Sequence, residues 1–295
     1  MNNLNGILLM IAAMAGFALE DMFVKQLSST ISISQILITL GICSSTVFAL
    51  MAKSKGHKLF AAHAWTMPAL ARMLAEAVAA VAFVTSLSLV PISTVAAIFQ
   101  ATPLVITMGA ALFLGEQVGW RRWTAITVGF IGVLIIIRPG YAGFDASVLF
   151  VLISVVGVTI RDLITRGMPD TIASTVISFQ AFLSLFLAGL VLLFVSSDSM
   201  VSVSGIESAF FAGAVVFGVS GYYGIVVAMR IGDTAAVTPF RYTRLLFSIA
   251  IGVFIFGERP DALTLLGAAI VIGTGLYTFF RERKLLLHGQ PVAEA

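Results

Sequence analysis

Charged side chains are scarce in this sequence. Only 11% of the 295 residues are Asp, Glu, Lys or Arg, and 59% are hydrophobic, whereas ordinary soluble domains are roughly 25% charged. A soluble globular protein is therefore not expected.

Cysteine and histidine are nearly absent too. Cys43 is the single cysteine, so neither an intrachain disulfide nor a cysteine-based metal site is possible, and we interpret it as a packing residue. The three histidines, His57, His63 and His288, fall in a predicted loop or in the C-terminal tail. The patterns HExxH, GxSxG and GxxxxGKS/T are also missing. These absences argue against an enzyme, a metal or cofactor site and ATP hydrolysis by this chain.

The sequence has long apolar runs instead. A transmembrane helix needs about 20 largely apolar residues to cross roughly 30 Å of hydrocarbon, and ten such runs follow one another with brief connections. The expected fold class is an all-α polytopic membrane protein with ten transmembrane helices. We expect the first helix to be retained, because Met1 to Gly6 has no basic residue and the run ends in Glu20 and Asp21 rather than in small residues. The predicted spans are Leu4–Lys25, Ile33–Met51, Met67–Leu87, Thr94–Leu114, Thr124–Ile137, Ser147–Arg166, Ile172–Val195, Ala209–Met229, Thr234–Phe256 and Leu263–Phe280.

Lysine and arginine are distributed unevenly between the predicted connections. With the N-terminus in the cytoplasm, the opposite side holds only Arg138 and Arg259. Because cytoplasmic loops carry an excess of Lys and Arg, both termini are predicted to be cytoplasmic. This bias also explains the formal net charge of +3, so no nucleic-acid partner is expected. The basic residues assigned to the cytoplasm are Lys53, Lys55, Lys58, Arg121, Arg122, Arg166, Arg230, Arg281, Arg283 and Lys284.

The chain contains an internal repeat. At an offset of 142 residues, the segment LGE at 114–116 matches FGE at 256–258, and at 141 residues Asp21 matches Asp162. We therefore predict two five-helix repeats, at residues 4–140 and 147–280, followed by a cytoplasmic tail at 281–295. Five is an odd number, so the second repeat enters the membrane in the opposite sense, with Glu116 facing the cytoplasm and Glu258 the outside. Inverted repeats are typical of secondary transporters, because two similar halves can open to either side at similar energy.

Several charged residues fall inside the predicted spans. A charge at the bilayer centre costs roughly 2.5 to 3.5 kcal/mol on insertion scales, so it usually faces a cavity or a partner. Arg72 and Glu76 lie four residues apart on one helix face, where they can pair. Arg241 and Arg244 lie about 10 and 15 Å into the ninth span at 1.5 Å per residue. Arg244 is thus expected near the midplane, across from Glu76.

Two further charged pairs lie near helix ends. Asp21 with Lys25 and Asp162 with Arg166 occupy matching positions in the two repeats. We interpret them as salt bridges that fix packing, since side chains at helix ends can snorkel to water.

Polar and aromatic residues surround the two arginines of the ninth span. Pro103 and Pro239 each remove a backbone hydrogen bond and predict kinks there, and bent helices often line transporter sites. Gln100 and Tyr242 are equivalent under the repeat. The predicted substrate-binding residues are Arg241, Arg244, Tyr242, Phe240, Gln100, Phe99, Glu76, Tyr222 and Tyr223.

Two segments resemble the EamA repeats of the drug/metabolite transporter superfamily. They are VGWRRWTAITVGFIGVLIIIRPG at 118–140 and FGERPDALTLLGAAIVIGTGLY at 256–277. The resemblance covers nearly the whole chain and implies ten helices with alternating access from a central cavity. The Asp-x-x-x-Lys pattern at 21–25 and Pro-Phe-x-Tyr-Thr at 239–243 are most similar to the uptake group that contains bacterial riboflavin transporters. Arg241 and Arg244 are less general within that pattern, which leaves the substrate open.

The leading hypothesis is a multi-pass permease of the bacterial inner membrane that takes up a small polar metabolite, with riboflavin as the first guess. The alternative is an exporter of an amphipathic or anionic metabolite, amino acid or drug, for which two midplane arginines would be natural. An intramembrane enzyme and a receptor or structural role are the hypotheses from other classes. The expected partners are the small-molecule substrate and the lipid bilayer, with a homodimer left open.

Overall fold

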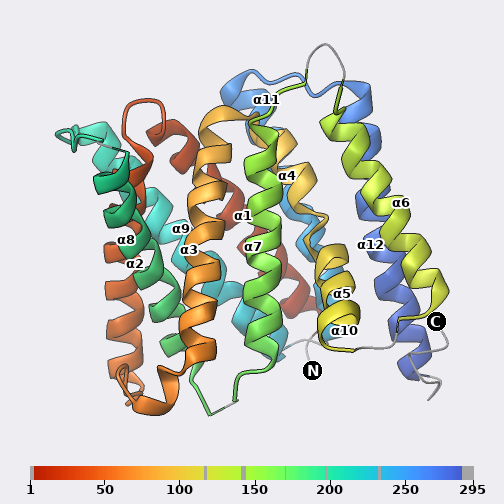
Figure 1. Cartoon of the computed structure of the whole chain (residues 1–295), viewed down its shortest axis with the longest axis horizontal. Coiled ribbons are helices and arrows are strands. Elements are labelled where there is room, and N and C mark those ends of the chain that lie inside the picture. Colours follow the sequence, from red (N-terminus) through yellow and green to blue (C-terminus); the bar gives the residue numbers. More distant parts are fainter. Residues whose placement is uncertain are drawn as a thin grey trace. The chain divides into compact units, whose positions relative to one another are not determined.

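The computed structural model describes residues 3–115, 118–140, 144–169, 171–196, 198–231 and 234–287, and these ranges contain helices and no strand (Figure 1). Ten helical segments among them are long and apolar enough to cross a membrane, so the predicted all-α polytopic class is confirmed. Glu116 and His288 lie outside the described residues. The elements are α1 Asn3–Leu27, α2 Ile33–Ser54, η1 Ala62–Ala64, α3 Met67–Leu89, α4 Ile92–Phe99, α5 Thr102–Phe113, α6 Trp120–Ile137, α7 Val148–Arg166, α8 Ser174–Val195, α9 Gly205–Ile231, α10 Thr234–Val237, η2 Thr238–Tyr242, α11 Thr243–Phe256 and α12 Ala262–Leu287.

Three helices extend clearly beyond their predicted spans. α12 ends at Leu287, seven residues after the predicted end at Phe280, and α9 begins at Gly205, four residues before the predicted start at Ala209. The third is α6. This helix begins at Trp120, four residues before the predicted start at Thr124. Arg121 and Arg122 lower the hydropathy of its first turn, but arginine is a good helix former. A prediction from hydropathy therefore places the start of this helix too late, although the helical backbone begins at Trp120.

The fourth and ninth predicted spans are both interrupted, as the kinks predicted at Pro103 and Pro239 suggest. α4 ends at Phe99 and α5 begins at Thr102, with Pro103 in the first turn of α5. The ninth span consists of α10, the 3-10 helix η2 with Pro239 in its first turn, and α11. The interruptions lie at Gln100 and Tyr242, two positions that the 142-residue offset relates.

The chain forms two compact units, and each takes helices from both halves of the sequence. Unit 1 comprises Met1–Leu19, Val90–Leu152 and Ser220–Ala295, and unit 2 comprises Glu20–Leu89 and Ile153–Val219. Unit 1 therefore holds the two interrupted spans together with α6 and α12, and unit 2 holds α2, α3 and α8. The compact units do not coincide with the repeats predicted at 4–140 and 147–280, which stay a prediction about the sequence.

Unit 2 is held together mainly by the packing of α2 along α8 (Figure 1). The two helices approach closely at Gly41, where an added Cβ would lie 2.7 Å from the Cα of Phe186. Next to this contact, Phe48 is 2% exposed and its ring lies 5.5 Å from that of Phe182. A side chain at position 41 would force the two backbones apart.

We expect Gly41→Ala to lower the free energy of unfolding by about 1 to 3 kcal/mol, the usual range for overpacking a tight core. The measurement is the unfolding midpoint of the purified protein in detergent. Gly205→Ala is the matched control, because no heavy atom lies within 4 Å of a Cβ added there. Equal midpoints for the two variants would contradict the tight α2–α8 contact.

Candidate functional site

Arg244 lies in the first turn of α11, directly after the interruption of the ninth span. Its guanidinium carbon is 5.2 Å from the ring centroid of Phe17 in α1 and 5.7 Å from that of Phe99 in α4. Both distances are within the range of cation–π attraction. The side chain is half-buried. Elements from the first and second halves of the chain thus meet at one guanidinium within unit 1.

The interruptions bring several helix ends into this region, where the N–H of Gln100 donates to the carbonyl of Ala96 and that of Ala101 to the carbonyl of Ile98. Each helix end leaves several backbone N–H or C=O groups without an intrahelical partner. At membrane depth such groups are tolerated only where they are buried in protein or line a wet cavity. Arg244 lies two residues after Tyr242, and Phe99 lies one residue before Gln100. The contacts of Arg244 with Phe17 and with Phe99 therefore both occur beside an interruption.

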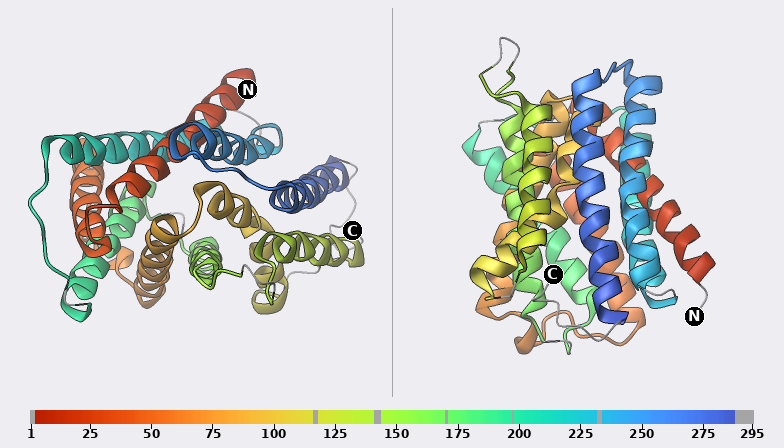
Figure 2. Two further views of the ribbon diagram at one scale, coloured as in Figure 1. Left: turned by 90° about the horizontal axis from the view of Figure 1, so that it is seen from above. Right: turned by 90° about the vertical axis from the view of Figure 1, so that its right-hand side faces the viewer.

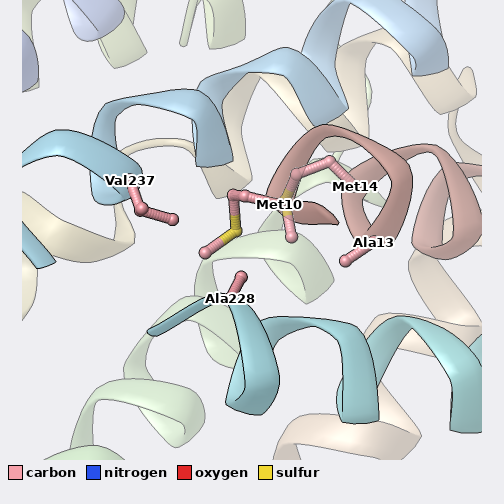
Figure 3. Packing of buried hydrophobic residues seen from close by; sticks show 5 residues of the cluster. All are labelled: Met10, Ala13, Met14, Ala228 and Val237. Carbon is pink, nitrogen blue, oxygen red and sulfur yellow. The ribbon is translucent and has the colours of Figure 1, made fainter. Parts of the chain in front are cut away.

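A buried apolar cluster supports one side of this arrangement. Met10, Ala13 and Met14 of α1 point toward Ala228 and Val237 (Figure 3). The partly buried rings of Phe17 and Phe240 pack against the same cluster. The ring of Phe17 is therefore fixed by packing at the position where it meets Arg244. Phe240 has a packing role here, and its predicted role in substrate binding stays a prediction.

Tyr242 packs toward α12. Its hydroxyl lies so close to Gly275 that a Cβ at position 275 would overlap it. The side chain is half-buried, and the small residue opposite allows the ring to approach the backbone of α12. Its predicted contact with substrate is not tested by this geometry.

The remaining predicted site residues of unit 1 lie on η2, on α9 and at the end of α4. Arg241 is exposed on η2, Gln100 is half-buried at the end of α4, and Tyr222 and Tyr223 lie on α9, with Tyr223 46% exposed. Phe99, another predicted residue of this unit, contacts Arg244. The roles of the others stay predictions.

Glu76, the ninth predicted residue, belongs to a charged network in unit 2. Its Oε1 accepts a hydrogen bond from Nη1 of Arg161 at 2.9 Å, and its Oε2 lies 3.5 Å from Nη2 of Arg72. The predicted pairing with Arg72 is confirmed. Nε of Arg72 donates to Oγ1 of Thr165, and Nε of Arg161 donates to Oδ1 of Asp162 at 2.8 Å. The predicted position of Glu76 across from Arg244 stays a prediction.

The bond between Arg161 and Glu76 was not predicted from the sequence. The sequence shows pairs within one helix at a spacing of four residues. A pair between α3 and α7 has no such signal, because the two residues are 85 positions apart.

A second feature that the sequence did not predict lies in unit 1 and is the set of hydrogen bonds to the carboxylate of Glu258. It accepts hydrogen bonds from the backbone N–H of Ile92 at 2.6 Å, the backbone N–H of Ser93 at 3.0 Å and the hydroxyl of Ser93 at 2.6 Å. A negative charge at a helix N-terminus satisfies free N–H groups and complements the helix dipole. Glu258 therefore caps α4 from the end of α11.

Two glycines make this cap possible. Gly257 has φ of +65°, a left-handed conformation that turns the chain back so that the N–H of Glu258 donates to the carbonyl of Gly252. A Cβ at Gly252 would lie 3.1 Å from the carboxyl carbon of Glu258. The Gly-Glu pair that marked the repeat in the sequence is thus part of a specific contact.

A transporter family model matches this chain. The model of the EamA-like transporter family matches residues 4–138. A crystal structure resembles the whole fold, with a TM-score of 0.59 and 15% sequence identity over 93% of this chain and 98% of that chain.

Relatives with assigned transport functions are also similar to this chain. An S-adenosylmethionine uptake transporter from Rickettsia conorii is 30% identical over 68% of this chain and 67% of its own length. A riboflavin transporter from Rhizobium johnstonii is 29% identical over 73% of this chain and 70% of its own. A pseudopaline exporter from Pseudomonas aeruginosa is 23% identical over 91% of this chain and 93% of its own. From these matches and the ten apolar helices, the chain is a multi-pass membrane protein that belongs to the EamA-like transporter family of the drug/metabolite transporter superfamily.

Proposed function

We propose that this transporter moves a small polar metabolite with a flat heteroaromatic ring across the bacterial inner membrane by alternating access. The observation that carries the proposal is the half-buried Arg244, whose guanidinium is in cation–π contact with both Phe17 and Phe99 beside the interrupted helices. These three residues are proposed to form part of the substrate site, together with the other residues predicted from the sequence.

The chemistry of the three side chains suits such a ligand. An aromatic ring of a substrate can stack on Phe17 or Phe99, as aromatic pairs do at centroid distances of about 4.5 to 7 Å. The planar guanidinium of Arg244 offers several N–H donors to a carbonyl or carboxylate oxygen, and a charge-assisted bond is roughly twice as strong as a neutral one. Both interactions strengthen where water is excluded.

Riboflavin is the first substrate to test, and S-adenosylmethionine is the second. Riboflavin is uncharged and carries carbonyl groups on its ring, so it suits a site with an arginine and aromatic side chains. S-adenosylmethionine has an adenine ring and a carboxylate that suit the same residues, but its sulfonium would lie in the positive field of Arg244. S-adenosylmethionine is nevertheless supported by the uptake transporter from Rickettsia conorii, because that transporter is as similar to this chain as the riboflavin transporter is, at 30% against 29% identity.

Uptake is the proposed direction, in keeping with the uptake function of the Rickettsia relative. Export of an anionic metabolite is the alternative, supported by the exporter from Pseudomonas aeruginosa, which matches over 91% of this chain. An anionic cargo would also suit an arginine in the site.

Exchange in proteoliposomes tests the substrate without any assumption about direction. Vesicles containing purified protein are loaded with unlabelled riboflavin or unlabelled S-adenosylmethionine, and the entry of the same labelled compound is followed. We expect transient accumulation of labelled riboflavin, absent from protein-free vesicles. Accumulation of S-adenosylmethionine alone would replace riboflavin as the substrate. Accumulation of neither compound would overturn the proposed substrate class.

Cells then establish the direction. A riboflavin auxotroph that expresses the protein should grow on lower external riboflavin than cells with an empty vector. Faster loss of preloaded label with no rescue of growth would reverse the direction to export.

A further inference from the structure

Unit 1 contains a cavity between α6 and α12. Its lining residues do not include Arg244, Phe17 or Phe99. The two helices pack side by side (Figure 2). The cavity has a volume of about 300 Å³ and lies between the first half of α6 and the middle of α12. The lining residues that matter here are Trp120, Arg121, Thr124 and Val128 of α6 and Gly273 and Tyr277 of α12.

The packing of the two helices explains why the space is there. Gly132 and Gly267 bring the backbones into close contact, since a Cβ added at Gly132 would lie 2.9 Å from the carbonyl oxygen of Gly267. At Gly273, further along α12, no heavy atom lies within 4 Å of an added Cβ. α6 and α12 are therefore in close contact at the glycines and leave a groove beside Gly273.

The groove lies at one edge of the membrane. Trp120 is the first residue of its membrane-spanning segment, and Arg281 is the last residue of the other. The floor at Val128 is about 12 Å further along α6 at 1.5 Å per residue. The groove therefore extends from the membrane–water interface into the hydrocarbon region.

Trp120, Arg121 and Tyr277 line the mouth of the groove, and Arg281 lies beside it in contact with Tyr277. The guanidinium carbon of Arg121 lies 5.1 Å from the ring centroid of Trp120, and Nη1 of Arg281 donates to the hydroxyl of Tyr277 at 3.4 Å. Trp120 is 69% exposed and Tyr277 is 48% exposed. Tryptophan and tyrosine are enriched at membrane interfaces, where their polar atoms reach the headgroups.

We propose that this groove binds an anionic phospholipid. The phosphate of the headgroup lies between Arg121 and Arg281, and one acyl chain follows the apolar wall formed by Val128 and the open space beside Gly273. Basic pockets between transmembrane helices attract anionic headgroups. The sequence adds charge of the same sign after Arg281, with Arg283 and Lys284 against one Glu282. A lipid satisfies both the charge at the mouth and the apolar wall, which a soluble anion does not.

Two variants test separately the positive charge at the mouth of the groove and the open volume inside it. Arg121→Gln removes a cation at the mouth, and Gly273→Leu fills the groove without changing any charge. The added side chain at 273 starts in open space, so this variant is expected to fold. Arg259→Gln is the control, because Arg259 is also an exposed arginine but is not among the groove residues.

The experiment is native mass spectrometry of the full-length protein in detergent, titrated with phosphatidylglycerol or with phosphatidylcholine. We expect the apparent affinity for phosphatidylglycerol to fall about fivefold in Arg121→Gln, the effect of one cation near an anionic lipid. Gly273→Leu should lower the affinity for both lipids, and Arg259→Gln should match the unaltered protein. Delipidated protein should prefer phosphatidylglycerol over phosphatidylcholine.

Two results would overturn the proposal. Equal binding of both lipids by the unaltered protein and by the two groove variants would show that the groove is not a lipid site. A dimer that dissociates in Gly273→Leu, with lipid binding unchanged, would assign the groove to a second copy of the chain.

Discussion

Arg244→Ala is expected to reduce the exchange of labelled substrate in proteoliposomes by about tenfold or more. The change removes the charge-assisted hydrogen bond proposed between the guanidinium and an oxygen of the substrate, which is worth about 1.5 to 3 kcal/mol. It also removes the group that lies between the rings of Phe17 and Phe99. Initial rates over a range of substrate concentrations give the apparent KM and the maximal rate. The loss should appear mainly in the apparent KM if Arg244 binds the substrate in its resting position.

Two further variants distinguish substrate binding from packing. Arg244→Lys keeps the charge but loses the planar donor group, so it should recover only part of the activity. Phe17→Leu keeps an apolar side chain but removes the ring, and a lost aromatic contact of about 0.5 to 1.5 kcal/mol should raise the apparent KM by about two- to tenfold. Size-exclusion profiles in detergent should be unchanged in all three variants. Exchange at the unaltered rate in Arg244→Ala would return this residue to a purely structural role.

Glu76→Gln is expected to give the largest loss of stability among single substitutions of unit 2. The side chain of Glu76 is 12% exposed and lies between the guanidinium groups of Arg72 and Arg161, whose side chains are 7% and 25% exposed. Breaking a buried ion pair by removing one partner costs about 3 to 5 kcal/mol, because the remaining charge has lost its compensation. The unfolding midpoint in detergent should therefore fall strongly.

An ion pair at the surface provides the control for this experiment. Nη2 of Arg138 and Oδ1 of Asp261 lie 2.5 Å apart, but the side chain of Asp261 is 50% exposed. Hydrogen bonds from Arg138 and Thr264 hold the pKa of the Asp261 carboxyl below its usual range. The ion pair therefore stabilises the folded protein at every pH above the pKa that the Asp261 carboxyl has in the unfolded chain. This stabilisation is lost only as the pH falls through the lower pKa of the same carboxyl in the folded protein. Asp261→Asn at pH 7 should cost no more than about 1 kcal/mol, and a Glu76→Gln effect of the same size would contradict the buried network.

The features that the sequence predicted correctly depend on short stretches of chain. The ten spans follow from apolar composition, and both interruptions lie beside prolines, because a missing N–H affects the helix at that position. Arg244 could be selected as a candidate because an arginine inside an apolar run is costly and therefore conspicuous, and its role in substrate binding stays a prediction. The start of α6 at Trp120 was missed since its first turn contains two arginines.

The features that were missed depend on contacts between distant residues. Phe17 is one of 23 phenylalanines, and nothing in its neighbourhood along the chain distinguishes it from the others. Its contact with Arg244 arises only when α1 and α11 are brought together. The bonds of Glu258 to Ile92 and Ser93 join residues more than 160 positions apart. The sequence therefore indicated candidate residues such as Arg244 and Phe99, but neither Phe17 nor the contacts between distant residues could be predicted from it.

The cap that Glu258 forms on α4 has a mechanical consequence. Separating α4 from the end of α11 would break three hydrogen bonds to one carboxylate, each worth about 1.5 to 3 kcal/mol. We infer that α4 and the end of α11 move as one rigid body during the proposed cycle. Bending is then confined to the interruptions at Gln100 and Tyr242, which act as paired hinges next to Phe99 and Arg244. A motion of these hinges would keep the guanidinium and the ring of Phe99 together and would move α5 and η2 relative to them, and thereby change the fit of the substrate.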